Sequence, residues 1–148
     1  LVRELGAELV IFYRHEDVSE AIMAWTGGSG VDVVVVTVGG ESFRSSLGAA
    51  RVYGHVVSLL DPGTDVAWKT ARDRNLSIHY TLMLTPRLQD LPAARRHQGE
   101  ILRHGAQLIE RGELAPRVDA TLALAEAATA HRLIEDGHVQ GKIVLLIT

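Results

Sequence analysis

The sequence predicts an α/β fold in which a parallel sheet is flanked by helices. Short apolar runs alternate with helical patterns from the start of the chain to Leu84, and the run from Val31 to Val38 holds six valines in eight residues. β-branched residues disfavour helix and favour strand, and an apolar run without alternation is typical of a central strand covered on both faces. Strands that alternate with helices are joined by crossovers, which align the strands in parallel.

The spacing of apolar residues and the capping residues predict the first secondary-structure elements. Ala7 to Phe12 is predicted as a short buried strand, and Val18 to Trp25 as a helix capped by Asp17. The glycine-rich segment 26–30 is predicted as a loop before the valine strand. Gly39 and Gly40 end that strand with a sharp turn and lead into the next helix.

The rest of the chain continues the alternation. Apolar residues at helical or strand spacing, with glycine, proline and asparagine between them, set the boundaries. The predictions are a helix over 41–53, a strand over 55–60, a turn over 61–63, a helix over 64–75, a strand over 76–84, a long helix over 87–111, a strand over 117–124, a helix over 125–135 and a strand over 141–148.

Composition and charge are those of an ordinary globular chain. It has 148 residues, 47% of them hydrophobic and 22% charged, and a net charge of −3. This length suits one domain that buries roughly two-thirds of its unfolded surface. The charge offers no basic field for nucleic acid or for anionic lipid. The chain has no cysteine, signal peptide or transmembrane run, so we expect a cytoplasmic protein without membrane or nucleic-acid partners.

The first six residues indicate that the sequence is a fragment. Leu1 to Gly6 has the pattern of the last turn of a helix with a glycine just past its end, and the chain does not begin with methionine. We therefore expect a preceding segment.

Ligands in parallel α/β sheets bind beyond the carboxyl ends of the strands. The predicted ends are Phe12 and Tyr13, residues 37–39, residues 58–60 and residues 82–84. Only the turn at Gly39 and Gly40 resembles a phosphate-binding loop. Taken alone, this turn is compatible either with a ligand site or with a strand-to-helix connection that binds no ligand. The chain contains neither a G-x-G-x-x-G fingerprint nor a P-loop.

Several stretches together resemble the medium-chain dehydrogenase/reductase superfamily, in particular its quinone oxidoreductase and zinc-type alcohol dehydrogenase branch. They are Leu5 to Asp17 (LGAELVIFYRHED), Thr26 to Phe43 (TGGSGVDVVVVTVGGESF), Leu108 to Pro116, Ala128 to Gly137 and Gly141 to Leu145. One departure is Val36, where the family usually has an aspartate before the turn. The resemblance implies a Rossmann-like domain over 1–112 that lacks its first βα units. Residues 113–148 would return to a GroES-like catalytic domain that this sequence does not contain.

The resemblance also implies a site for NADP(H), with zinc ligands only in the catalytic domain. Tyr13 would flank the adenosine ribose or 2′-phosphate and Arg14 would add charge there. Residues 37–39 would face the adenosine and ribose, residues 58–60 the nicotinamide half and residues 82–84 the carboxamide. The cofactor-binding residues so predicted are Tyr13, Arg14, Thr37, Val38, Gly39, Ser58, Leu59, Leu60, Leu82, Met83 and Leu84. No catalytic side chain is expected in this chain, because the cofactor performs the chemistry and the protein orients it.

The histidines do not suggest a metal site. No H-x-x-x-H pair occurs, and His97 and His104 share a helical face without a third ligand, so we expect both to be solvated. His131 is expected to pack or to form a hydrogen bond. Trp25 and Trp68 are expected as core or rim aromatics.

Two functions remain open from the sequence. The first is part of an NADP(H)-dependent oxidoreductase that moves hydride between the nicotinamide and a small-molecule quinone, enone, aldehyde or alcohol, and is inactive alone. The second is a complete, non-catalytic α/β module that binds a ligand or a partner. The resemblance further implies a homodimer through the apolar strand 76–84, whose uncovered edge would be an association site.

Overall fold

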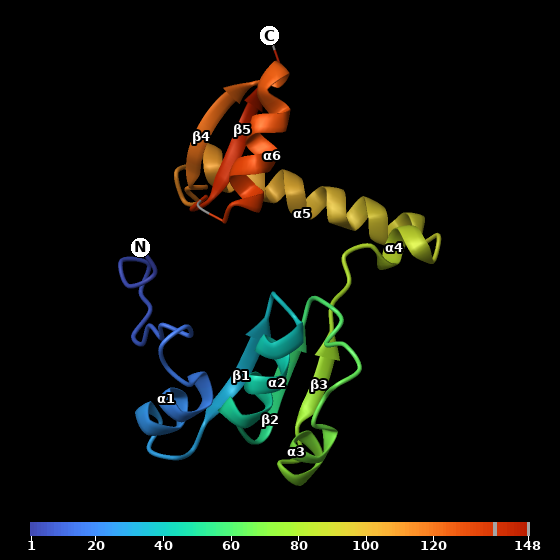
Figure 1. The fold of residues 1–148 in the computed structure, drawn as a ribbon. Helices are drawn as coiled ribbons and strands as arrows, with labels where there is room; N and C mark the ends of the chain where they lie inside the picture. The colour runs from blue at the N-terminus through green and yellow to red at the C-terminus, as the bar shows by residue number, and fades with distance from the viewer. Residues whose placement is uncertain (138, 148) are drawn as a thin grey trace. The chain divides into compact units, whose positions relative to one another are not determined.

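The computed structural model describes residues 1–137 and 139–147, so Thr148, the last residue of the predicted final strand, lies outside them. The chain divides into two compact units, Leu1 to Thr85 and Pro86 to the end. Both contain parallel strands with flanking helices, which confirms the predicted α/β class (Figure 1). The division at 112/113 concerns domains of a longer protein and stays a prediction.

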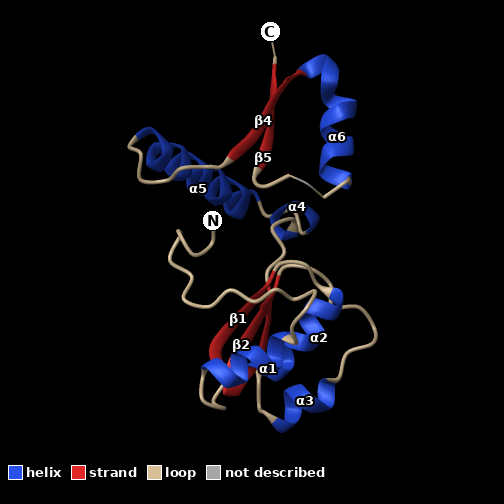
Figure 2. Cartoon of the chain, turned by 60° about the vertical axis from the view of Figure 1, so that its left-hand side comes forward, coloured by secondary structure: helices blue, strands red, loops and turns tan. Residues whose placement is uncertain are grey.

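The first unit is built on a three-stranded parallel sheet. Its strands β1 (Val31–Val36), β2 (Ala50–Ser58) and β3 (Ser77–Tyr80) lie in that order. The helices α1 (Val18–Trp25), α2 (Gly40–Ala49) and α3 (Trp68–Asp73) lie on one side of this sheet (Figure 2). Three of the four apolar segments predicted before residue 85 therefore run side by side in one direction.

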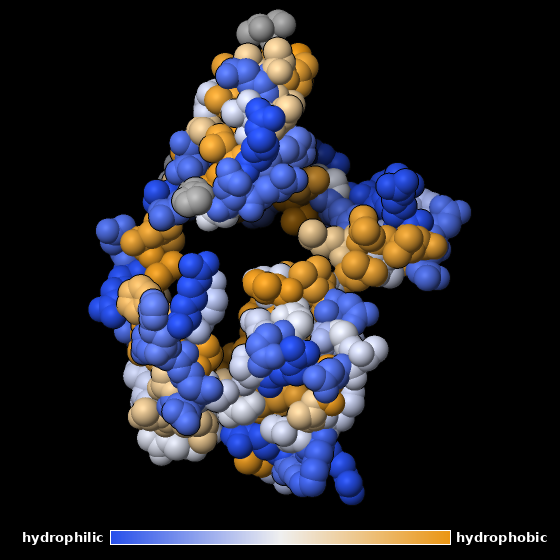
Figure 3. All heavy atoms as spheres, in the orientation of Figure 1, coloured by the Kyte–Doolittle hydropathy of each residue, from blue (hydrophilic) through white to orange (hydrophobic). Residues whose placement is uncertain are grey.

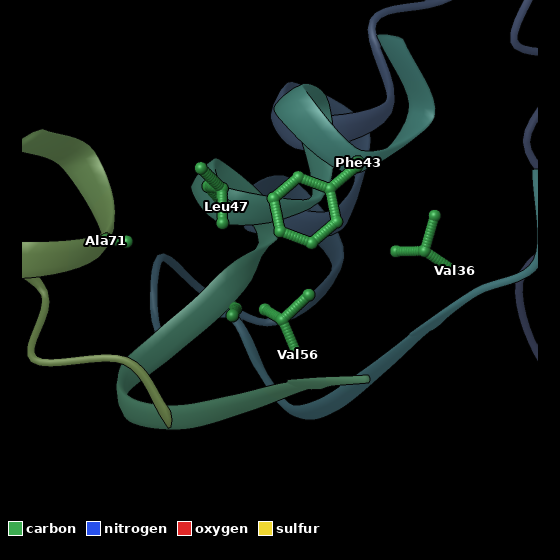
Figure 4. Close-up of a cluster of buried hydrophobic side chains, with 6 residues drawn as sticks. Val36, Phe43, Leu47, Val56 and Ala71 are labelled. Atoms are coloured by element: carbon green, nitrogen blue, oxygen red, sulfur yellow. The ribbon is translucent and has the colours of Figure 1, made fainter. Parts of the chain in front are cut away.

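The core lies between the sheet and α2. Phe43 and Leu47 project from α2 and are fully buried against Val36 of β1 and Val56 of β2, with Ala71 of α3 beside them (Figure 4). Trp68 meets Phe43 edge-on, with ring centroids 6.1 Å apart. Four-residue spacing on the helix and alternation on the strands thus bring the same apolar set together.

None of the helices of the first unit covers the opposite face of the sheet. Val33 and Val35 are 52% and 61% exposed, and β1 lies at an edge of the three-strand order. The expectation of a central strand covered on both faces is therefore wrong for these residues. The valine run favours a strand, but whether its side chains are buried depends on what packs against them.

The predicted strand over 7–12 is also wrong. Phe12 closes a turn instead: its carbonyl accepts hydrogen bonds from the N–H groups of His15 and Glu16, and its own N–H donates to the Glu16 carboxylate. These local bonds use the backbone groups that a sheet ladder would need. Just before it, residues 1–7 form turns in which the Leu5 N–H donates to the Leu1 carbonyl.

Several boundaries differ from the predictions. The helix predicted over 41–53 ends at Ala49, because Ala50 pairs with Val31 and its carbonyl accepts two hydrogen bonds from the Arg74 guanidinium. The helix predicted from Thr64 begins only at Trp68, and the strand predicted over 76–84 is paired only from Ser77 to Tyr80. The Asp17 cap is confirmed, since its carboxylate accepts from the Glu20 N–H at 2.8 Å.

The second unit holds a parallel pair, β4 (Val118–Ala123) and β5 (Lys142–Leu146), joined through the 3₁₀ turn η1 (Leu124–Glu126) and the helix α6 (Ala127–Glu135). The long helix predicted over 87–111 is split into α4 (Thr85–Leu88) and α5 (Pro92–Glu110). The break falls at Asp90, whose φ of 47° is incompatible with a right-handed helix, and Pro92 then starts α5. None of the α5 side chains is fully buried.

No helix in the described ranges combines the length and the hydropathy needed to cross a lipid bilayer.

Candidate functional site

The carboxyl ends of the three strands meet along one edge of the sheet. Val36, Ser58 and Tyr80 form one row across it. Two hydrogen bonds of 3.0 Å extend the ladder past this row, from the Leu59 N–H to the Val36 carbonyl and from the Thr81 N–H to the Ser58 carbonyl. The structure therefore brings the predicted segments 37–39, 58–60 and 82–84 to the same edge, which is where α/β sheets bind ligands.

Gly39 fixes how the first two of these segments approach each other. It is buried and has φ of 74° and ψ of −160°, a conformation that is accessible essentially to glycine alone. A Cβ at this position would lie 2.9 Å from the Asp61 carbonyl oxygen and 3.2 Å from the Leu60 Cβ. The glycine thus allows the turn after β1 to pack against the chain that leaves β2.

Ser58 uses its hydroxyl inside the chain. The side chain is fully buried, and its Oγ donates a 2.7 Å hydrogen bond to the Leu60 carbonyl. This bond folds the chain back directly after β2 and so positions Leu59 and Leu60 at the edge. The Ser58 hydroxyl therefore stabilises the backbone of the site, and its proton is already donated to the Leu60 carbonyl.

The side chains presented at this edge are mostly apolar. Met83 is 78% exposed and Val38 73% exposed. We call the exposed apolar set here the apolar rim; it consists of Val38, Leu59, Leu60, Leu82, Met83 and Leu84. Figure 3 shows apolar residues gathered on the surface beyond the strand ends. Several exposed apolar side chains at one place are typical of a ligand-binding or protein-binding surface.

Tyr13 and Arg14 lie in the turn-rich N-terminal segment instead of at the end of a paired strand. The Arg14 guanidinium lies 6.0 Å from the centroid of the Tyr13 ring, and both side chains are exposed. Together with Ile11, Phe12 and His15 they line a cavity of about 170 Å³. A cation next to an aromatic ring suits a phosphate adjoining a planar base.

The charged pair of the sheet lies at its other end. Arg51 Nε donates a 2.5 Å hydrogen bond to Asp32 Oδ1, joining the starts of β2 and β1. This hydrogen bond, with the attraction of the guanidinium charge, lowers the pKa of the Asp32 carboxyl below its ordinary value. The pair links the amino ends of β1 and β2. It therefore lies at the end of the strands opposite to the apolar rim.

The histidines of the described chain include one close pair that the sequence did not predict. His55 Nδ1 and His79 Nε2 are 3.1 Å apart on neighbouring strands, although 24 residues separate them. The sequence places His55 and His79 in two predicted strands. It does not give the register between these strands, which brings the two rings together. His97 and His104 are exposed on α5, as predicted, whereas His131 is exposed on α6 and does not pack as expected.

Within residues 1–137 and 139–147, no three His, Asp or Glu side chains are grouped closely enough to hold a metal ion. His138 lies outside these residues. The described donor set therefore does not fit a zinc site of the usual three or four protein ligands.

Comparison with known proteins gives matches over nearly the whole chain. Residues 5–145 match the model of the family described as zinc-binding dehydrogenase. The chain is 31% identical over 151 residues to a 2-haloacrylate reductase from a Burkholderia species, covering 97% of this chain and 43% of the relative. It is 30% identical over 149 residues to a quinone oxidoreductase from Pseudomonas aeruginosa, covering 99% of this chain and 45% of the relative.

The fold is likewise shared with solved structures. An alcohol dehydrogenase superfamily protein from Novosphingobium aromaticivorans superposes with a TM-score of 0.82 at 30% identity, over 99% of this chain and 44% of the other. The crystal structure of 2-haloacrylate reductase gives a TM-score of 0.73 at 28% identity, over 99% and 45%. The chain thus spans less than half the length of these relatives. It belongs to the zinc-binding dehydrogenase family, within the medium-chain dehydrogenase/reductase superfamily.

Proposed function

We propose that this chain forms part of the nucleotide-binding half of an NADP(H)-dependent oxidoreductase of the quinone reductase and alcohol dehydrogenase type. The observation that carries the proposal is the convergence of residues 37–39, 58–60 and 82–84 at one sheet edge, in a chain whose relatives include a 2-haloacrylate reductase and a quinone oxidoreductase. The substrate would be a small quinone, enone, aldehyde or alcohol, and the compartment the cytoplasm.

The described residues fit the ring and ribose portions of such a cofactor better than its diphosphate. The apolar rim offers a surface for the planar nicotinamide and for the adenosine, and the turn at Gly39 lets backbone approach a ribose closely. Arg14 beside Tyr13 suits a 2′-phosphate. The glycine-rich cradle that would hold the diphosphate has no counterpart in the sequence.

The roles of these residues are binding, orientation and exclusion of water. When bound, the nicotinamide supplies the hydride. Leu59, Leu60 and the segment 82–84 would pack along the ring and keep water away from its reacting face. Ser58 would act through the turn it holds, because its proton is bound to the Leu60 carbonyl. We propose that the catalytic surroundings of the substrate come from a further domain and that this chain alone is inactive.

An NMR titration tests the proposal directly. NADPH added to the ¹⁵N-labelled chain should shift amide signals of residues 37–39, 58–60 and 82–84, with affinity in the millimolar range because the diphosphate lacks its cradle. Val38→Asp should weaken these shifts, since a carboxylate repels the anionic cofactor and is costly to desolvate. Val52→Asp, at an exposed position near the start of β2, is the matched control and should leave them unchanged.

Two outcomes of that titration would contradict the proposal. The first is a set of shifted signals that excludes the three segments. The second is micromolar binding by this chain alone, which would favour the complete, non-catalytic module. Turnover of NADPH with a quinone by the chain alone would likewise contradict its proposed inactivity.

We further propose a homodimer through β3. This strand ends the order β1-β2-β3, so in the described chain its outer edge has no partner strand. Residues 82–84 beyond it are exposed and apolar. Such an edge is a template for pairing with a second chain. Light scattering at micromolar concentration should give twice the 16.1 kDa mass of the chain, and a monomer would refute this assembly.

A further inference from the structure

The face of the first sheet opposite α1, α2 and α3 carries two histidines that point the same way. Their strand neighbours Val56 and Ile78 pack into the core with the helices, so alternation directs His55 and His79 to the opposite face. In the register His55 lies opposite Ser77 and His79 opposite Val57, which makes the two rings diagonal neighbours across β2 and β3. Both side chains are exposed.

The distance between the rings matches the spacing of two ligands on one metal ion. His55 Nδ1 and His79 Nε2 are 3.1 Å apart. Two nitrogens bound to one ion at about 2.0–2.1 Å, at angles between octahedral and tetrahedral, are separated by roughly 2.9–3.4 Å. The ring centroids are 5.3 Å apart and the planes tilted by 35°, so the rings are not stacked face to face. Both rings are exposed, so an ion can reach the facing nitrogens, and chelation requires each ring to turn its lone pair toward that ion.

The protonation of the two rings is compatible with metal binding. A neutral pair at hydrogen-bond distance has one ring nitrogen donating to the other. On metal binding the donor ring carries its proton on its other nitrogen, so both facing nitrogens present lone pairs and no net proton is released. The register neighbours on this face are Val33, Val57 and Ser77, none of which carries a charge that would compete with the ion.

We propose that His55 and His79 form a two-histidine chelating site for a divalent transition-metal ion such as Ni²⁺ or Cu²⁺, with water in the remaining positions. Imidazole nitrogen is a preferred ligand of these ions. The site shares no residue with the apolar rim and is independent of the proposed cofactor chemistry. Because it joins β2 to the four-residue edge strand β3, a bound ion stabilises the first unit by mass action.

Calorimetric titration of the full chain with Ni²⁺ tests the site. We expect one ion per chain, and at least about a tenfold loss of affinity in His79→Gln, since even loss of a residue that only supports a metal ligand costs 10–100-fold. His55→Gln should behave in the same way. His104→Gln removes an exposed histidine of α5 and is the matched control that should keep the wild-type affinity.

A second readout locates the ion. Substoichiometric Cu²⁺, which is paramagnetic, should broaden the amide signals of Val57 and Ser77 before those around His104 or His131. Ni²⁺ should raise the midpoint of thermal unfolding followed by tryptophan fluorescence, and His79→Gln should abolish the rise. Equal affinity in wild type and His79→Gln, or equal loss in His104→Gln, would overturn the proposal, as would the absence of binding at millimolar Ni²⁺.

Discussion

Gly39→Ala tests whether the close approach between the turn after β1 and the chain after β2 holds the candidate site together. The backbone at Gly39, with φ of 74° and ψ of −160°, lies in a region where a non-glycine residue costs of order 1–3 kcal/mol. The added methyl group would also meet the Asp61 carbonyl oxygen at 2.9 Å and the Leu60 Cβ at 3.2 Å. Relief of that overlap requires backbone movement, which costs typically about 1–3 kcal/mol more. We therefore expect a loss of roughly 2–6 kcal/mol in the free energy of unfolding.

Gly63→Ala is the matched control. Gly63 has a similar φ of 81°, but a Cβ there would meet no atom within 4 Å. Its cost should be only that of the left-handed backbone, about 1–2 kcal/mol. The difference between the two variants isolates the steric contact with the segment after β2.

Urea denaturation followed by tryptophan fluorescence is a suitable assay. Both tryptophans of the chain, Trp25 and Trp68, belong to the first unit, and Trp68 contacts the core through Phe43. The signal therefore reports the unit that contains Gly39. Equal losses in Gly39→Ala and Gly63→Ala would refute the inferred packing of the two turns.

Three further predictions concern the core, the charged pair and a loop of the first unit. Phe43→Ala should lower the free energy of unfolding by about 3–5 kcal/mol, because the side chain is fully buried. Phe12→Ala is the control: Phe12 is 63% exposed, so its loss should be less than about 0.5 kcal/mol. Similar losses in the two variants would contradict the assigned core. Asp32→Asn should destabilise the fold more at pH 7 than at pH 3. The hydrogen bond from Arg51 lowers the folded-state pKa of Asp32, so its stabilisation is present above the ordinary value of 3.8 and is lost as the pH falls through the lowered pKa. Urea midpoints of both proteins at the two pH values measure this, and an equal gap at both would be inconsistent with the ion pair. Thr26→Val should cost about 1–3 kcal/mol by leaving the Gly30 N–H without the Thr26 hydroxyl, which accepts from it at 2.9 Å. Thr26→Ser keeps that oxygen, and a Ser variant as unstable as the Val variant in the same urea assay would argue against this bond.

The strongest local patterns predicted the strands and helices of the first unit well. The valine run forms β1, Asp17 caps α1, and the four-residue spacing of Phe43 and Leu47 places both in the core. These features depend on residues close in sequence, whose backbone preferences and side-chain periodicity act locally. The grouping of residues 37–39, 58–60 and 82–84 at one edge followed as well, because crossover connections force neighbouring strands to end together.

Predictions failed where a distant partner decides the outcome. Ala50 continues the helical pattern, yet it starts β2 because its carbonyl is bound by Arg74, 24 residues later. The strand predicted through Phe12 failed for a local reason instead, because the Phe12 backbone groups are hydrogen-bonded within their own turn. The exposure of Val33 and Val35 depends on which face of the sheet the helices cover, and a run of valines is the same on either face.

By itself, then, the sequence determined the fold class, the parallel direction of the strands, the sheet edge that the strand ends share and the family resemblance. Only the tertiary structure decided that Gly39 packs against Asp61, that the Ser58 hydroxyl is internally bonded and that His55 lies beside His79. The reason is that helix and strand formation follow from short-range sterics and periodicity, whereas these three contacts depend on strand register and on turn geometry. Register and turn geometry are fixed only when the whole sheet packs.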